Sequence, residues 1–201
     1  MKVDIYVEGG ARDKRDLKVQ CQKGFHKLFD KMGFSRNPAV IPCGNRGATF
    51  KRFKSALQNN RNDTFVVMLV DSEDPVQDIE KPWAHLRARK EDRWIKPEGA
   101  SDDQIFLMTT CMETWIVADR ESIAKYYGSR FSLNALPPKE NLESHHRHEL
   151  KDKLEKATKD CTNRFKKGER SFEVLAIVTP AALRSLPSFA RMERILKEKL
   201  R

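Results

Sequence analysis

Two short apolar runs each end abruptly in carboxylates, and this pattern restricts the fold more than any other feature of the chain. Residues 3–7 alternate apolar and polar side chains and are followed by Glu8 and two glycines. Residues 65–70 are all apolar and are followed by Asp71. A continuous apolar run of this length is typical of a strand buried on both faces of a parallel sheet. The two runs therefore predict a layered α/β domain with acidic residues at one edge of its sheet.

The pattern between these runs indicates two helices and one further strand. Over residues 13–32 apolar side chains recur at intervals of three and four, as on one face of a helix, and Gly33 closes the segment. Residues 39–43 predict a short strand, and residues 50–57 mark the apolar face of a second helix. The resulting order, βαβαβ, is typical of a layered α/β sheet.

The remainder of the chain is less regular. Residues 75–103 predict a short helix and a long loop that covers the acidic edge of the sheet. Further elements are expected as a strand over 105–108, helices over 111–127 and 141–160, a strand or a helix over 171–178, and an amphipathic helix over 189–200. We expect a mostly parallel central sheet with helices on both faces over residues 1–135. Residues 136–201 are expected to form a helical C-terminal extension packed on the same domain.

Composition excludes several classes of protein. The 201 residues can bury one sizeable core. No run approaches the roughly 18 apolar residues of a membrane span, so no membrane partner is expected. The predicted strand at residues 3–7 leaves no room for a signal peptide, and the four scattered cysteines show no CxxC spacing. We therefore expect a cytoplasmic protein with reduced thiols.

The net charge of +10 is unevenly distributed along the chain. Residues 1–60 hold 13 Lys and Arg against 5 Asp and Glu, whereas residues 61–138 hold 10 against 14. Residues 139–201 are basic again, with 16 against 10. A basic surface around an acidic centre suits a polyanion such as DNA or RNA, although a solvated surface without a partner fits the same charge pattern. The candidate nucleic-acid-binding residues are Arg12, Lys14, Arg15, Arg46, Lys51 and Arg52.

Five carboxylates are candidate metal ligands. Glu8 and Asp71 follow neighbouring predicted strands, and residues just past the C-terminal ends of parallel strands line the ligand crevice of such sheets. Glu73 lies two residues after Asp71, on the same side if the strand continues, and Asp74 is adjacent. Crowded carboxylates repel one another, and a divalent cation relieves that repulsion.

Simpler explanations exist for each of these acidic residues. Residues 71–74 also suit a solvated turn closed by Pro75. Glu113 follows the predicted strand over 105–108, where it either completes the acidic site or favours the positive end of a helix.

Several motifs resemble those of the Toprim domain of topoisomerases, primases and overcoming-lysogenization-defect nucleases. They are Glu8-Gly9 after the first strand and the run LVDSEDP at residues 69–75. With METWIVAD at residues 112–119 and LPSF at residues 186–189, the chain is most similar to small bacterial Toprim-like proteins encoded beside AAA-type ATPases (RloG-like).

The resemblance implies a metal-dependent site that cleaves phosphodiester bonds. It implies that Glu8 is the general acid and base, and that Asp71 and Glu73 hold Mg²⁺ or Mn²⁺. The second acid of the family pattern is aspartate, so Asp74 competes with Glu73 for that role. The resemblance also implies an AAA/ABC-type ATPase partner and a function in anti-phage defence.

We therefore predict a Mg²⁺- or Mn²⁺-dependent nuclease that acts on DNA or RNA. The main alternative is a non-catalytic subunit that binds nucleic acid or the ATPase and carries a vestigial or regulatory metal site. A small-molecule phosphohydrolase or nucleotidyl transferase, and a structural adaptor, also fit. The sequence leaves open whether the chain forms a homo-oligomer.

Overall fold

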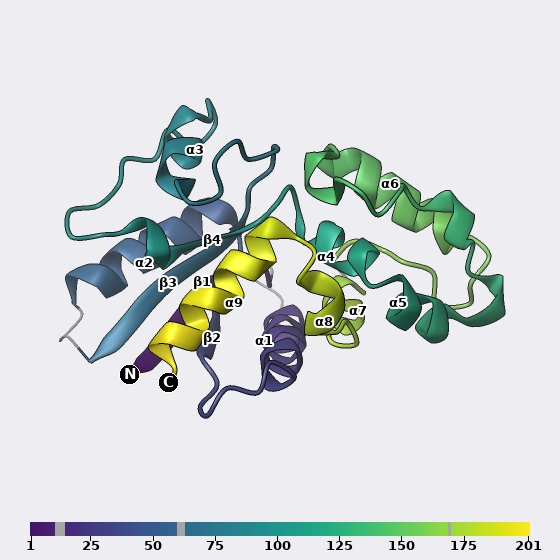
Figure 1. Cartoon of the computed structure of the whole chain (residues 1–201), viewed down its shortest axis with the longest axis horizontal. Helices are drawn as coiled ribbons and strands as arrows, with labels where there is room; N and C mark the ends of the chain where they lie inside the picture. Colours follow the sequence, from purple (N-terminus) through teal and green to yellow (C-terminus); the bar gives the residue numbers. More distant parts are fainter. Residues whose placement is uncertain (11–14, 60–62, 169) are drawn as a thin grey trace.

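A four-stranded parallel sheet forms the centre of the protein in the computed structural model, which describes residues 1–10, 15–59, 63–168 and 170–201 (Figure 1). The strands are β1 (Lys2–Val7), β2 (Ala39–Pro42), β3 (Thr64–Asp71) and β4 (Ile105–Met108), in the spatial order β2-β1-β3-β4. All three pairings are parallel. The expected α/β fold with a mostly parallel sheet is confirmed, and it is consistent with a Toprim-like arrangement.

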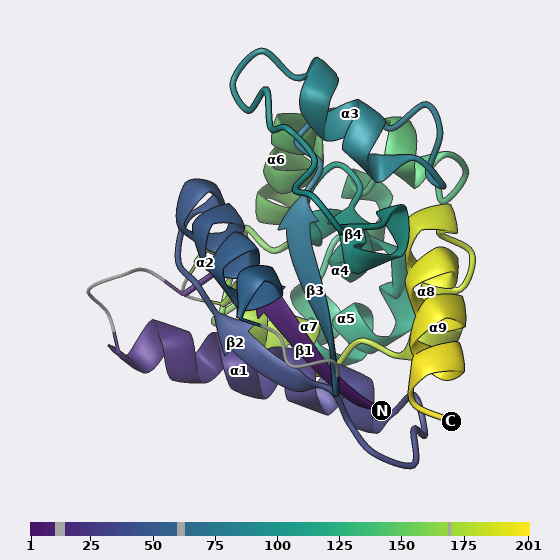
Figure 2. The same cartoon turned by 90° about the vertical axis from the view of Figure 1, so that its left-hand side faces the viewer.

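Helices cover both faces of the sheet. The described helices are α1 (Arg15–Asp30), α2 (Arg46–Gln58), α3 (Pro82–Ala88), α4 (Met112–Ala118), α5 (Arg120–Tyr127), α6 (Arg147–Ala157), α7 (Ser171–Leu175), α8 (Pro180–Leu183) and α9 (Pro187–Lys199). Short 3-10 turns lie at Asp102–Gln104, Gly128–Arg130, Leu133–Ala135 and Leu142–Ser144. The two chain ends lie close together, and α6 lies at the end of the molecule away from α2 (Figures 1 and 2).

The alternation of side chains along β3 divides the core in two. Val67 and Leu69 face a large cluster built with α1, α4 and the C-terminal helices. Val66, Met68 and Val70 face a smaller cluster under α2 and α3. Because β3 is buried on both sides, its sequence reads as a continuous apolar run.

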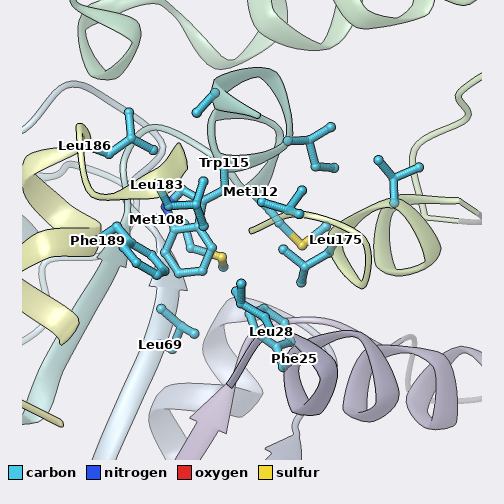
Figure 3. Close-up of a cluster of buried hydrophobic side chains, with 14 of the residues drawn as sticks. Phe25, Leu28, Leu69, Met108, Met112, Trp115, Leu175, Leu183, Leu186 and Phe189 are labelled. Atoms are coloured by element: carbon cyan, nitrogen blue, oxygen red, sulfur yellow. The ribbon is translucent and has the colours of Figure 1, made fainter. Parts of the chain in front are cut away.

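The C-terminal extension shares the larger core cluster. Phe189 of α9 packs edge-on against Trp115 of α4, with ring centroids 5.3 Å apart, and Leu175 of α7 lies in the same cluster (Figure 3). The division at residue 135 stays a prediction, but residues on both sides of it share one core.

The single helix predicted over residues 111–127 is wrong. Asp119 ends α4 and begins α5, because its carboxylate accepts a hydrogen bond from Ser122 N at 3.1 Å and caps the new helix. The same carboxylate accepts hydrogen bonds from Thr179 N at 2.7 Å and Thr179 Oγ1 at 2.8 Å. These hydrogen bonds fix the junction between α4 and α5 to Thr179, the residue before α8.

Two other expectations change at the C-terminal side. The helix predicted from residue 141 begins only at Arg147, after a 3-10 turn at Leu142–Ser144. The sequence predicts a strand or a helix over residues 171–178, and the structure has the helix α7 over Ser171–Leu175. None of the described helices is both long enough and apolar enough to cross a membrane.

Candidate active site

Two acidic residues leave neighbouring strands at the same edge of the sheet. At the end of β1, Val7 pairs with Leu69 of β3, and Glu8 N donates to Leu69 O at 2.9 Å. Strand β3 ends two residues after Leu69, at Asp71. Glu8 and Asp71 therefore both follow this last pairing of the two strands. Both carboxylates line a cavity of about 350 Å³, which the side chains of Glu73, Glu113 and Lys167 also line. This edge is the one where ligands of open parallel sheets bind.

Glycine is required in the wall of this cavity. Gly9 has φ +141°, and it exchanges backbone hydrogen bonds of 2.8 and 2.9 Å with Gly44 of the next crossover. A Cβ atom on Gly9 would lie 2.8 Å from Phe172 Cζ, which is too close for a side chain. The Glu8-Gly9 sequence therefore places a carboxylate beside a turn that only glycine fits.

Unlike Glu8, Glu73 and Glu113, the carboxylate of Asp71 has no ion-pair partner among the described residues. Its Oδ1 is buried and has no hydrogen-bond partner among the residues that the structure describes. Burial raises the pKa of Asp71 well above its usual range, and repulsion from Glu8 and Glu113 raises it further. A cation placed here would relieve both effects.

Glu8 has an environment suited to proton transfer. Burial raises its pKa, while the nearby charge of Arg46 opposes the shift. Arg46 Nη1 lies 3.5 Å from Glu8 Oε2, and the side chain of Glu8 is 20 % exposed. A carboxyl group at the mouth of a cavity, with its pKa raised by burial, holds a proton more readily than an ordinary surface carboxylate and can pass it to a bound group.

Glu113 and Lys167 close the far side of the cavity. Glu113 is fully buried in the first turn of α4, and the only cation that lies against its carboxylate among the described residues is Lys167, with Nζ 3.5 Å from Oε2. Burial lowers the pKa of Lys167, but the charges of Glu113 and Asp71 outweigh that effect and raise it overall. The sequence marks no motif around Lys167, so local patterns did not predict its place in the cavity.

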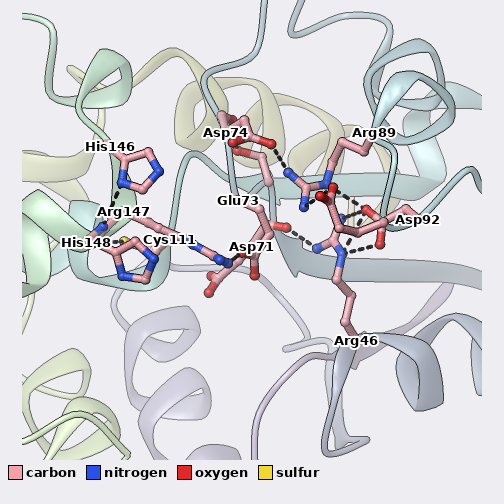
Figure 4. A network of polar contacts seen from close by, with 12 residues as sticks. Arg46, Asp71, Glu73, Asp74, Arg89, Asp92, Cys111, His146, Arg147 and His148 are labelled. Atoms are coloured by element: carbon pink, nitrogen blue, oxygen red, sulfur yellow. Dashed lines mark hydrogen bonds and ion pairs between the residues drawn. The ribbon is translucent and has the colours of Figure 1, made fainter.

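The side chains of Glu73 and Asp74 lie in different places after β3 ends. Glu73 has φ +70°, so the chain is no longer extended and the alternation that predicted its direction stops. Glu73 still lines the cavity with Asp71, and its carboxylate pairs with Arg147 of α6 (Figure 4). Asp74 instead pairs with Arg89 and lines a different hollow, beside α3.

Arg46 belongs to a network of ion pairs behind the cavity. Its Nε and Nη2 donate to Asp92 at 2.9 and 2.7 Å, and Nη1 donates to the carbonyl of Asp71 (Figure 4). The guanidinium also stacks on Trp94, 4.8 Å from the ring centroid. Arg89 shares the carboxylate of Asp92, which is only 6 % exposed. Arg46 therefore holds the segment after α3 against the sheet edge.

The other predicted nucleic-acid contacts lie outside this network. Arg15 and Lys51 are exposed at α1 and α2, and Arg52 Nη1 donates to Pro42 O at 3.1 Å. Arg12 and Lys14 lie outside the described residues. The role of this surface stays a prediction.

The donor set suits a hard cation, although the described residues form no complete cage. Carboxylate oxygens are the ligands that Mg²⁺ and Mn²⁺ prefer. Within residues 1–10, 15–59, 63–168 and 170–201, no three His, Cys, Asp or Glu side chains are grouped to hold a metal ion. Mg²⁺ is often held by one or two carboxylates, with water and substrate phosphate completing its coordination. The unpaired Asp71 Oδ1 fits that kind of site.

The fold and this cavity define an α/β protein with an acidic pocket at the C-terminal edge of a parallel sheet. Residues 13–197 match the family model described as a domain of unknown function (DUF4276), and the chain belongs to that family. Comparison with curated proteins and with solved structures found no match.

Proposed function

We propose that this protein is a divalent-metal-dependent nuclease that cleaves phosphodiester bonds in DNA or RNA. The observation that carries the proposal is the carboxylate of Asp71, which is buried without a hydrogen-bond donor to Oδ1 from the described residues. Glu8 and Glu113 lie close enough to raise its pKa by repulsion. Burial and the neighbouring carboxylates disfavour the ionised form of Asp71, and a bound cation would stabilise that form.

Asp71 would hold Mg²⁺ or Mn²⁺, together with Glu73 or Glu113 from the same cavity. When bound, the ion would polarise a phosphate and stabilise charge on the leaving oxygen. Asp74 is less favoured as a ligand because its carboxylate is paired with Arg89 outside the cavity.

Two further residues of the cavity have roles in this proposal. Glu8 would transfer a proton between its carboxyl oxygen and the attacking or leaving group. Lys167 is half exposed, and its ammonium would donate to a phosphate oxygen.

The proposed substrate follows from charge. The chain carries a net charge of +10, and the exposed cations Arg15 and Lys51 lie on the crossover helices α1 and α2. A partner ATPase of the AAA/ABC type, and a role in defence against phage, rest on the Toprim-like resemblance alone.

A specific observation favours the second candidate, a non-catalytic subunit with a vestigial or regulatory metal site. Three of the cavity's carboxylates already have a cation partner: Arg46 lies on Glu8, Arg147 on Glu73 and Lys167 on Glu113. A site neutralised in this way binds a metal ion more weakly. This candidate predicts binding of nucleic acid or of the ATPase without cleavage.

Calorimetric titration of Mn²⁺ tests the metal site. We expect binding to the wild-type protein, its loss in Asp71→Asn, and weaker binding in Glu8→Gln. Asp152→Asn is the matched control, because Asp152 is 72 % exposed on α6 and does not line the cavity. Equal binding in Asp71→Asn and the wild type would contradict the proposal.

Cleavage is then measured on labelled DNA and RNA with Mn²⁺, alone and with any AAA/ABC-type ATPase that is encoded beside this protein, as the resemblance implies. The nuclease proposal predicts cleavage that is lost in Asp71→Asn. If the protein binds metal and nucleic acid but cleaves neither polymer under any of these conditions, the result favours the non-catalytic subunit.

The basic surface is tested separately. Charge reversal at Arg15 and Lys51 should weaken nucleic-acid binding and make it less sensitive to salt, by about one unit of slope for each phosphate that is no longer neutralised. Arg46 is left intact in this test because its replacement would also disturb Asp92 and Trp94.

A further inference from the structure

One ion pair joins the C-terminal extension to the acidic cavity. Arg147 is the first residue of α6, and its guanidinium reaches the carboxylate of Glu73 (Figure 4). The side chain of Glu73 is 14 % exposed and that of Arg147 is 37 % exposed. Glu73 lines the same cavity as Asp71, so Arg147 delivers a fixed positive charge to that cavity.

The backbone holds both partners in place. Glu73 N donates to Thr110 O at 2.8 Å, which fixes the turn after β3 against the segment after β4. Thr110 Oγ1 donates to His145 O at 3.0 Å, and Cys111 Sγ contacts Arg147 O at 3.9 Å. The two charged residues are therefore attached to the same short segment, Thr110 and Cys111. This anchoring distinguishes Arg147 from an arginine that meets a carboxylate by chance.

Because Arg147 pairs with Glu73, a divalent cation would have to compete with Arg147 for the carboxylate of Glu73. An arginine remains charged at all physiological pH values, so loss of a proton from Arg147 does not release Glu73. A guanidinium beside a carboxylate neutralises its charge and lies where a divalent ion bound to that carboxylate would lie. Because Arg147 is more than a third exposed, the pair is screened by water and a stronger ligand can displace it.

We propose that Arg147 is an autoinhibitory residue, which lowers the affinity of the cavity for a divalent cation by occupying Glu73. This inference rests on the proposed function, because it concerns the same metal site. A metal ion that binds Asp71 and Glu73 would release the guanidinium. The freed arginine, positioned at the rim, would then contact a phosphate of the substrate through two parallel hydrogen bonds.

The test is calorimetric titration of Mn²⁺ into the full chain with Arg147→Gln. We expect affinity to rise by about threefold to fivefold, the upper part of the range that exposed ion pairs span. Lys151→Gln is the matched control, since Lys151 lies on the same helix and pairs with Glu155 at 3.5 Å rather than with the cavity. Its affinity should stay within about twofold of the wild type.

A second pair of variants separates direct competition from a general change of charge. In a Glu73→Gln background the contested carboxylate is absent, so adding Arg147→Gln should leave Mn²⁺ affinity unchanged. Circular dichroism confirms that each variant is folded before titration.

The outcomes distinguish the two proposals. Tighter binding in Arg147→Gln alone supports the inference. Equal or weaker binding in Arg147→Gln than in the wild type, or an equal gain in the Glu73→Gln background, overturns the inference and leaves the metal site standing. No Mn²⁺ binding in any variant overturns the metal site itself, and the inference with it.

Discussion

Lys167 Nζ lies 3.5 Å from Glu113 Oε2, although 54 residues separate the two in the chain. Glu113 is only 1 % exposed and Lys167 is 49 % exposed, so the ammonium covers a buried carboxylate from the solvent side. The contact joins the segment before α7 to the first turn of α4. It shows that the acidic cavity is completed by residues from both halves of the chain.

The first prediction concerns this pair. Lys167→Met should lower the free energy of unfolding by about 1 kcal/mol, because it leaves Glu113 buried without a charged partner. The double variant Lys167→Met, Glu113→Gln should recover most of that loss. Urea unfolding measures both values. Additive losses in the double variant would show that the two side chains do not interact.

The second prediction concerns Asp71 and pH. Because the folded protein holds the pKa of Asp71 above its usual value, ionisation of Asp71 destabilises the fold. The contribution of Asp71 to stability should therefore fall as pH rises from about 4, the usual carboxylate pKa, through the raised value. Asp71→Asn removes this titration and should be about 1 kcal/mol more stable than the wild type at pH 8, with little difference at low pH.

Urea unfolding in EDTA at several pH values checks this prediction, since a chelator removes any stabilisation by metal. Glu98→Gln, at an exposed site, serves as the control. If Asp71→Asn is less stable than the wild type at pH 8, the ionised carboxylate of Asp71 stabilises the fold, and our interpretation of the cavity is wrong.

The third prediction concerns Asp92. Burial acts to raise the pKa of Asp92, but hydrogen bonds and charges from Arg46 and Arg89 outweigh it and lower the value. The stabilisation is thus present above about pH 4 and is lost as pH falls through the lowered pKa. At neutral pH Asp92→Asn should cost about 2–3 kcal/mol, because two arginines lose their shared partner.

Asp74→Asn is the comparison for this measurement. It removes another partner of Arg89, but Asp74 is 53 % exposed, so the cost should stay below about 1 kcal/mol. Similar losses for the two variants in urea unfolding would contradict the structural role assigned to Asp92.

The fourth prediction concerns Gly24 in the middle of α1. Alanine favours a helix by about 1 kcal/mol over glycine, yet a Cβ here would lie 2.7 Å from Phe172 O. Gly24→Ala should therefore destabilise the protein by about 1–2 kcal/mol, because it pushes α7 away from α1. Gly47→Ala, where the nearest atom is 3.8 Å away, should be neutral or stabilising. Equal effects of the two substitutions would show that the α1–α7 contact is looser than described.

The fold could be predicted largely because its strands have local signatures. The continuous apolar run of β3 and the alternation in β1 identify a parallel sheet without any knowledge of distant contacts. The break at Asp119 could not be predicted in the same way. Apolar periodicity continues across it, and the residue that fixes its side chain, Thr179, lies 60 positions away.

The candidate site could be predicted in part. Glu8, Asp71, Glu73 and Glu113 were expected at one sheet edge, and they line one cavity because each follows a strand or opens the next helix. Arg147 and Lys167 were missed because no local pattern marks them and both come from the C-terminal extension. Arg46 was expected as a surface contact, yet its partner Asp92 lies 46 positions away in an irregular segment.

Binding of a divalent cation in the cavity beside Asp71 is the property on which the proposed function depends. The most direct test is a crystal structure of the protein grown with Mn²⁺, in which anomalous scattering locates the ion. Our account predicts an anomalous peak at about 2.0–2.2 Å from an Asp71 carboxylate oxygen, with a second ligand from Glu73 or Glu113. An Mn²⁺ peak found only elsewhere, with the carboxylates of the cavity still paired to Arg46, Arg147 and Lys167, would contradict it.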